Sequence, residues 1–346
     1  MTENTIYYVC GHTASGFVNL IESNLVNINK VILLQHPSKQ VIAEVLSYVK
    51  KEIGKEEPYE ALSSPYFANQ LEGIIFRNRS LAILTADVLE EKASDVTKLD
   101  LTRWFPMTLS DETKADTNYL QSEAYRHFAK ALTIHDDLEA IYIEEMDFEK
   151  ADHIANELLQ QLFKDVPKKH STAYVFERLF GTNTIDGAIN KVEQIIDPIK
   201  HRFFVKGRAG TGKSVLLKKI LEKSKQYGYD VELHRCSFDP NSIDMVLIPE
   251  LDYCLFDSTA PHEFFPTRYE DQVIDLYEQT VTAGTDEKYK ETIQHVTHAY
   301  KSEMKKGLSY LQKLKDYQPF KSMQELEIND EPDLFDDIIK EIIKLT

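Results

Sequence analysis

The chain has 346 residues, which corresponds to about two domains at roughly 100–200 residues per domain. Lys and Arg number 40 and Asp and Glu 57, so the formal net charge is −17, while 42% of the residues are apolar. This composition excludes a disordered chain and disfavours a general nucleic-acid or anionic-membrane binder, because an acidic surface repels phosphate.

The N-terminal segment lacks the features of a targeting signal. Its first residues, MTENTIYYVCGHTASG, contain no basic region followed by an apolar one. No stretch of the chain approaches the roughly 18 apolar residues of a membrane span. Cys10, Cys236 and Cys254 are an odd number without metal-like spacing, which favours free thiols in a reducing compartment. We therefore expect a cytoplasmic protein with no membrane partner and no zinc site.

Two glycine-bearing segments, 11–16 (GHTASG) and 181–187 (GTNTIDG), predict turns. The first is not followed by Lys and Ser or Thr but by Phe17 and Val18, so it does not match a phosphate loop. We interpret both as turns that cap a helix. The alternative is that they reach the base of a nucleotide.

Residues 31–46, VILLQHPSKQVIAEVL, predict a strand followed by a helix in the first half. The strand Ile32–Leu34 leads through His36 to Lys39, and no glycine lies between them. Pro37 also removes one backbone N–H from the connection. The backbone here therefore cannot wrap around a phosphate.

Residues 111–163 show helical apolar periodicity without a proline and predict a helical hairpin appended to the first half. Residues 164–174, KDVPKKHSTAY, combine a proline with clustered charge and predict a linker. The alternative to a solvated linker is that the basic residues of this segment contact an acidic partner. We accordingly expect one domain over 1–168 and a second over 169–346.

The strongest motif lies at 202–214, RFFVKGRAGTGKS, which matches the P-loop pattern G-x-x-x-x-G-K-[ST]. The preceding run predicts a strand, and the following periodicity predicts a helix that ends at Gly228. Glycines let backbone N–H groups converge on phosphate, Lys213 adds a charge, and the Ser214 hydroxyl ligates Mg²⁺. The residues expected to bind the nucleotide are Gly207, Arg208, Ala209, Gly210, Thr211, Gly212, Lys213, Ser214 and Val215.

Two further strands are predicted at 231–236 (VELHRC) and 252–257 (DYCLFD). The second ends in Asp257, as in the Walker B arrangement, where a carboxylate at the end of a strand holds the shell of Mg²⁺. The alternative is that Asp257 caps a helix or turn. The metal candidates are Ser214 and Asp257, and the catalytic candidates are Lys213, Asp257 and Glu250. Residues able to orient the attacking water are Glu250, His262 and Glu263, which the sequence does not rank.

Two helical segments follow in the second half. Residues 286–315 are periodic and charge-rich and predict an antiparallel pair or a short coiled coil. The acidic tail 327–345 predicts an amphipathic helix that packs back on the body. These helices and those of the first half provide a surface for a protein partner or for self-association.

Three blocks of sequence recur in the same order at offsets of 171, 172 and 175 residues. The matching blocks are 16–33 with 187–204, 70–87 with 242–259, and 111–125 with 286–300. We therefore predict a tandem duplication. In this alignment Gln40 and Thr85 occupy the places of Ser214 and Asp257. The first copy is thus expected to have lost nucleotide binding.

The second half resembles a bacterial family of tandem P-loop ATPases in the segments FFVKGRAGTGKSVLLKKI, CSFDPNSIDMVLIPELDYCLFDSTAPHEFFP and DEKYKETIQHVTHAYKSEMKKG. The resemblance implies an α/β fold of two P-loop NTPase-like domains, each a parallel sheet with flanking helices and a helical hairpin insertion or extension. The loop of the first half departs from the family pattern at residues 36–40. The resemblance implies ATP and Mg²⁺ without supplying a substrate.

The sequence thus favours an ATP-binding NTPase in which Mg²⁺-dependent hydrolysis is coupled to conformational change. No guanine-reading N-K-x-D pattern is present, which favours ATP over GTP. One alternative is a small-molecule kinase, for which Arg235 and Arg268 are the few candidate lid arginines. The other is a nucleotide-binding regulatory protein with negligible turnover.

Overall fold

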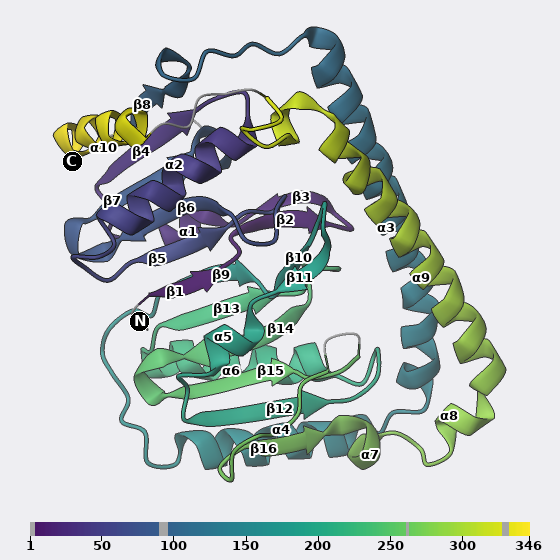
Figure 1. The fold of residues 1–346 in the computed structure, drawn as a ribbon. Coiled ribbons are helices and arrows are strands. Elements are labelled where there is room, and N and C mark those ends of the chain that lie inside the picture. Colours follow the sequence, from purple (N-terminus) through teal and green to yellow (C-terminus); the bar gives the residue numbers. More distant parts are fainter. Residues whose placement is uncertain (1–3, 90–95, 261–262, 327–331) are drawn as a thin grey trace.

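The chain forms two α/β units of similar construction. The computed structural model describes residues 4–89, 96–260, 263–326 and 332–346. In Figure 1 one unit lies above the other, and a long pair of helices runs beside both. This architecture bears out the predicted α/β class and suggests two tandem Rossmann-like domains.

Each unit is built on a six-stranded sheet, and corresponding strands have the same order in both. The first sheet has the order β1 (Thr5–Tyr7), β5 (Glu60–Ser63), β6 (Leu71–Phe76), β7 (Leu81–Thr85), β4 (Lys30–Gln35), β8 (Val96–Asp100). The second has β9 (Val175–Leu179), β13 (Val231–Arg235), β14 (Ile243–Ile248), β15 (Tyr253–Asp257), β12 (His201–Lys206), β16 (Gln272–Asp275).

Both sheets are mixed, so the prediction of parallel sheets is wrong for one strand of each. β6 and β14 run antiparallel to both of their neighbours. The reason is the short connection that follows each of them. Between β14 and β15 lies a single turn, Pro249–Leu251, closed by Asp252 at φ +57°. A link this short joins only antiparallel strands, because a parallel pair needs a long crossover.

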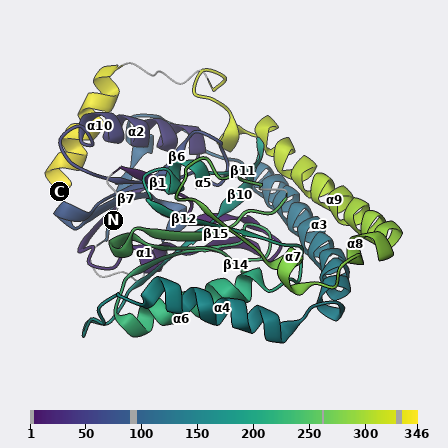
Figure 2. The ribbon, with the colours of Figure 1, turned by 90° about the horizontal axis from the view of Figure 1, so that it is seen from below.

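One helix follows β4 in the first unit and β12 in the second, and each packs on its sheet. These helices are α2 (Lys39–Glu52) and α6 (Lys213–Tyr227), and Figure 2 shows them at opposite sides of the molecule. Apolar residues of α6 at helical spacing, among them Leu217 and Ile220, are fully buried. The helix ends where Gly228 adopts φ +78°, which confirms the predicted stop.

The two glycine-bearing segments are β-hairpins rather than simple helix-capping turns. The hairpins are β2 (Cys10–Thr13) with β3 (Gly16–Asn19), and β10 (Gly181–Thr184) with β11 (Gly187–Asn190). Gly16 and Gly187 turn the chain at φ +95° and +118°, which a side chain would disfavour. The short helices α1 (Ile21–Asn24) and α5 (Val192–Ile196) follow directly.

The longest helices pair with each other across the two halves. They are α3 (Asp111–Glu144) and α9 (Lys290–Gln312), which lie side by side over much of their length. Glu303 of α9 is buried in this interface, where His127 and Lys130 of α3 contact its carboxylate at 2.7 and 3.1 Å. An antiparallel pair involving 286–315 is thus present, but its partner is α3.

The helix after each long helix packs on the opposite unit. α4 (Phe148–Phe163) buries Leu158 and Leu162 against the second sheet, together with α6. α10 (Pro332–Leu345) buries Ile338 and Ile342 against the first sheet, together with α2. The prediction that 111–163 forms a hairpin on the first half is therefore wrong. The predicted amphipathic tail helix is confirmed over 332–345, while 327–331 lie outside the described residues.

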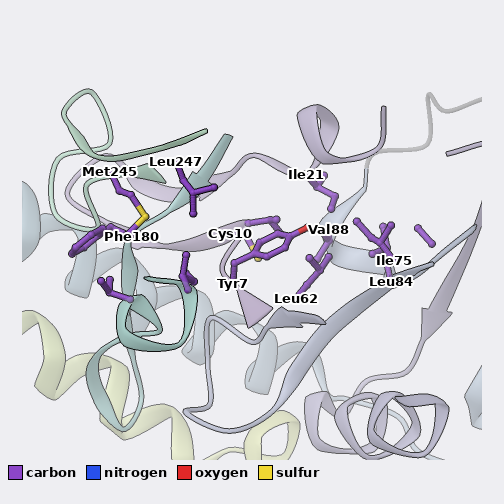
Figure 3. Close-up of a cluster of buried hydrophobic side chains, with 14 of the residues drawn as sticks. Tyr7, Cys10, Ile21, Leu62, Ile75, Leu84, Val88, Phe180, Met245 and Leu247 are labelled. Atoms are coloured by element: carbon purple, nitrogen blue, oxygen red, sulfur yellow. The ribbon is translucent and has the colours of Figure 1, made fainter. Parts of the chain in front are cut away.

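The two units share one core. Tyr7, Cys10 and Leu62 of the first unit lie in the same buried cluster as Phe180 and Met245 of the second, as Figure 3 shows. The edge strands β1 and β9 meet here, because Leu179 N–H donates to the carbonyl oxygen of Tyr8 at 2.8 Å.

A buried arginine crosses the same boundary. Arg178, 1% exposed, donates to Glu232 at 2.5 Å and stacks on the ring of Tyr7 at 3.5 Å. Its guanidinium also lies 3.9 Å from Glu60 of the first unit.

None of the helices in the described part of the chain has the length and apolarity needed to cross a bilayer.

Candidate functional site

The loop at 207–212 joins β12 to α6 in a conformation that requires glycine. Gly210 and Gly212 adopt φ +75° and +82°. A Cβ on Gly207 would lie 2.3 Å from Thr211 Oγ1, and one on Gly210 would lie 2.6 Å from the carbonyl oxygen of Glu139 in α3. The glycines of the motif therefore serve this turn, and the loop presents the N-terminus of a 15-residue helix.

The structure brings Lys213, Ser214 and Asp257 together. β12 and β15 are parallel neighbours, so their carboxyl ends reach the same edge of the sheet. Lys213 Nζ lies 3.6 Å from Asp257 Oδ2 and donates to the carbonyl oxygen of Arg208 at 2.7 Å. Ser214 Oγ accepts a hydrogen bond from Ile243 N–H at 2.9 Å. Asp257 ends a strand, as predicted, and faces the loop lysine rather than serving only as a cap.

A cavity of about 950 Å³ opens in front of the loop. The loop and the first turn of α6 line it with Ala209, Gly210, Thr211, Gly212, Lys213, Ser214 and Val215. Its other walls come from α3, α9 and the β10–β11 hairpin, which contribute His135, Tyr300 and Asn183. The volume suits a small-molecule ligand, for which sites typically span about 300–1,000 Å³.

Arg208 faces away from this cavity. It forms an ion pair with Asp286 at 2.9 Å and stacks on Tyr277 at 4.5 Å from the ring centre. Tyr142 of α3 also donates to Asp286, at 2.9 Å. Arg208 thus ties the loop to α8 (Thr285–Lys288), which directly precedes α9.

Glu250 does not reach the loop, and its prediction as a catalytic residue is wrong for this conformation. β14 runs antiparallel to β15, so the turn that holds Glu250 lies at the opposite edge of the sheet from Asp257. Glu250 pairs there with Lys169. Glu263 pairs with Lys206 at 3.0 Å, and His262 lies outside the described residues.

The arginines considered for a kinase lid are engaged elsewhere. Arg235 forms an ion pair with Glu177 at 2.8 Å, and Arg268 forms one with Asp197 at the same distance. Neither residue lines the cavity.

Asp244 also lines the cavity, and no sequence motif pointed to it. It lies on β14, where a β-bulge interrupts the pairing with β13. Burial raises the pKa of Asp244 to about 7, and the neighbouring carboxylate of Asp257 contributes. The signal that could have identified it is the β14–β15 hairpin, which carries an acid on each strand.

The first unit has different groups at the corresponding place. Lys39 at the start of α2 forms an ion pair with Asp87, and burial lowers its pKa. Thr85 donates to Glu72 at 2.8 Å. His36 bonds instead to the carbonyl oxygen of Phe105 at 2.7 Å. The loop glycines are absent, and Lys39, Thr85 and His36 are each engaged by neighbouring groups of the same unit.

Oxygen donors at the second site suit a hard cation. Within 4–89, 96–260, 263–326 and 332–346 no group of three or more His, Cys, Asp or Glu residues forms a metal cage. Mg²⁺ needs no such cage, because it is commonly held by one or two carboxylates with substrate phosphates and water. Ser214 and Asp257 fit that pattern.

Comparison with protein-family models, curated proteins and solved structures finds no match for this chain.

Proposed function

We propose that the chain is an ATP-binding P-loop NTPase of the tandem type, active in its second half and deficient in nucleotide binding in its first. The observation that carries this proposal is the loop at 207–212 followed by Lys213, which lies 3.6 Å from Asp257 at the edge of a cavity of about 950 Å³. In this role Lys213 contacts the β- and γ-phosphates, and Ser214 and Asp257 hold Mg²⁺ directly or through water.

Phosphoryl transfer needs positioning and charge stabilisation more than covalent chemistry. The loop N–H groups and the N-terminus of α6 provide fixed positive dipoles. Lys213 leaves its bond to the Arg208 carbonyl oxygen when a phosphate oxygen replaces that acceptor. Mg²⁺ supplies neutralisation of the triphosphate when bound. ATP is favoured over GTP because no guanine-reading motif is present.

The contacts around the loop support a coupling of hydrolysis to the long helices. Gly210 lies against the backbone of α3, and Arg208 is held by Asp286 before α9. A phosphate that attracts Arg208 or shifts the loop therefore acts directly on both helices. Those helices continue to the first unit, so a change at the nucleotide has a path to it.

The test is phosphate release from ATP and Mg²⁺ by the full chain, compared with Lys213→Ala and Lys39→Ala. We expect Lys213→Ala to reduce release by at least about 100-fold, because it removes the charge on the transferred group. Lys39→Ala controls for the loss of a lysine at the corresponding place and is expected to leave ATP affinity unchanged.

Three outcomes would contradict the proposal or a part of it. Tight ATP binding without phosphate release would identify a kinase or a nucleotide-binding regulator instead. No ATP binding by the parent protein would exclude all three functions. A large loss of affinity in Lys39→Ala would overturn the assignment of the first unit as deficient.

A further inference from the structure

Asp244 and Asp257 lie on neighbouring antiparallel strands, and both line the cavity. The pairing of β14 with β15 ends at Met245 with Phe256, and Asp244 and Asp257 adjoin that pair at the same end of the two strands. Burial and the charge of Asp257 both raise the pKa of Asp244, and like charges close together on adjacent strands are destabilising. The protein therefore maintains an unfavourable pair of acids beside the P-loop lysine.

The first unit has the same backbone without this repulsion. Glu72 and Thr85 stand at the equivalent positions of β6 and β7, and Glu72, like Asp244, is the residue left unpaired at a β-bulge. The Thr85 hydroxyl donates to Glu72 at 2.8 Å, which shows that side chains at these positions reach each other. One unit thus pairs an acid with a hydroxyl, and the other, which has the P-loop, pairs it with a second acid.

Lys213 compensates the two acids while no phosphate is bound. It lies 3.6 Å from Asp257, and its charge also acts on Asp244. Binding of a triphosphate draws this lysine toward phosphate oxygens, as P-loop chemistry requires. The carboxylates then face each other and the phosphates with less positive charge between them. A divalent cation restores the balance.

We propose that Asp244 is the second carboxylate of the metal site, so that Asp244 and Asp257 together hold Mg²⁺ with the nucleotide phosphates. This inference rests on the proposed nucleotide site. It makes Mg²⁺ and nucleotide binding mutually dependent: the nucleotide removes the lysine from the acids, and the acids require the metal. Mg²⁺ commonly takes one or two carboxylates in such sites.

The test measures the affinity of a fluorescent ATP analogue in EDTA and over a Mg²⁺ titration, for the parent and Asp244→Asn. We expect the variant to need roughly 10-fold more Mg²⁺ for half-maximal tightening, a typical loss for a disturbed metal site. Its affinity in EDTA should be unchanged or higher, because a negative charge beside the phosphates is gone. Without ligand its thermal midpoint should be equal or higher, because the repulsion is relieved.

Two matched variants serve as controls. Asp239→Asn removes a different acid from the same cavity wall, and Glu72→Gln removes the equivalent acid of the first unit. Neither is expected to change the Mg²⁺ dependence. Asp244→Ser provides a second replacement at the site should the amide disturb folding.

The outcomes separate this inference from the proposed function. A parent protein that binds no ATP analogue in either condition contradicts the nucleotide site itself. A parent that binds with Mg²⁺-dependent affinity, together with an Asp244→Asn variant of equal Mg²⁺ dependence, overturns the role of Asp244 alone. A lower thermal midpoint of the ligand-free variant would contradict the repulsion on which the argument depends.

Discussion

At the scale of single residues, the site depends on positions where a side chain is either required or forbidden. Lys213 is required because its ammonium group lies 3.6 Å from Asp257 and faces the cavity. Gly210 is forbidden a side chain twice over, since its φ is positive and its Cβ would meet the α3 backbone. The two effects can be measured separately, because the chain offers a glycine that has only the first.

We predict that Gly210→Ala abolishes nucleotide binding and lowers stability by more than Gly284→Ala. Gly284 has φ +87° with no atom within 4 Å of an added Cβ. Its substitution therefore costs only the free energy of holding a residue with a side chain in the left-handed backbone conformation, about 1–2 kcal/mol. Gly210→Ala adds a clash at 2.6 Å with a carbonyl oxygen that cannot move freely. Urea unfolding and ATP titration of both variants check this. Equal losses in the two variants would show that α3 does not press on the loop.

At this scale the sequence predicted which residues lie together where the motif is local. The P-loop and Asp257 are a motif and a strand end, and the structure places them as neighbours. The sequence placed Glu250 beside the loop and did not point to Asp244 at the cavity, and one error explains both. The direction of β14 decides which of its ends faces the loop, and that direction follows from the short β14–β15 link rather than from apolar periodicity.

At the scale of elements, the pair α3–α9 is held by a buried carboxylate among cations. Glu303 accepts hydrogen bonds from Lys306, His127 and Lys130. These bonds, with Lys306 first, lower the pKa of Glu303 to about 2. Its ionised form is therefore stabilised by folding. The contribution is complete above the ordinary pKa of about 4.5 and is lost as the pH falls toward 2.

We predict that Glu303→Gln destabilises the protein by on the order of 2 kcal/mol at pH 7, a usual value for charge-assisted hydrogen bonds. The difference from the parent should shrink as the pH falls from 5 to 2, because the parent then loses the same interaction. Thermal unfolding at several pH values provides the measurement. Glu291→Gln, an exposed change on the same helix, is the control and should have little effect. A difference that stays constant with pH would argue against the ion cluster.

The sequence did not predict which sheet each amphipathic helix packs against. The apolar stripe of α4 or α10 predicts that one face is buried but not against which sheet. Each helix follows a long helix that carries the chain to the other unit, so neighbours in sequence are not neighbours in packing. The strands that the sequence did predict lie in β4, β12, β13 and β15, where β-branched and aromatic runs stand between turn residues.

At the scale of the whole molecule, the shared core and the crossed helices link the stability of the two units. Tyr7 and Phe180 lie in one cluster, and α10 completes the first unit from the far end of the chain. Loss of either unit exposes apolar surface of the other. Unfolding is therefore expected to be cooperative across both.

We predict that Ile338→Ala lowers stability by about 2–5 kcal/mol, the usual range for a large buried residue, whereas Ile343→Ala on the same helix has little effect. Ile338 is fully buried and Ile343 is 53% exposed. Trp104, the single tryptophan, reports on the first unit, and ATP-analogue binding reports on the second. Both signals should vanish at one urea concentration, lowered together in Ile338→Ala. Separate transitions would show that the units unfold independently.

The helix exchange also bears on how such a chain can arise. A polypeptide with only one copy could not cover its own sheet with its last helix, since that helix belongs on the other unit. Two such polypeptides would complete each other as a two-fold symmetric dimer with identical sites. Fusion into one chain ends that symmetry, because each copy can then change alone. The two acids beside the P-loop and the Glu72–Thr85 pair differ in the way that such independent change would produce.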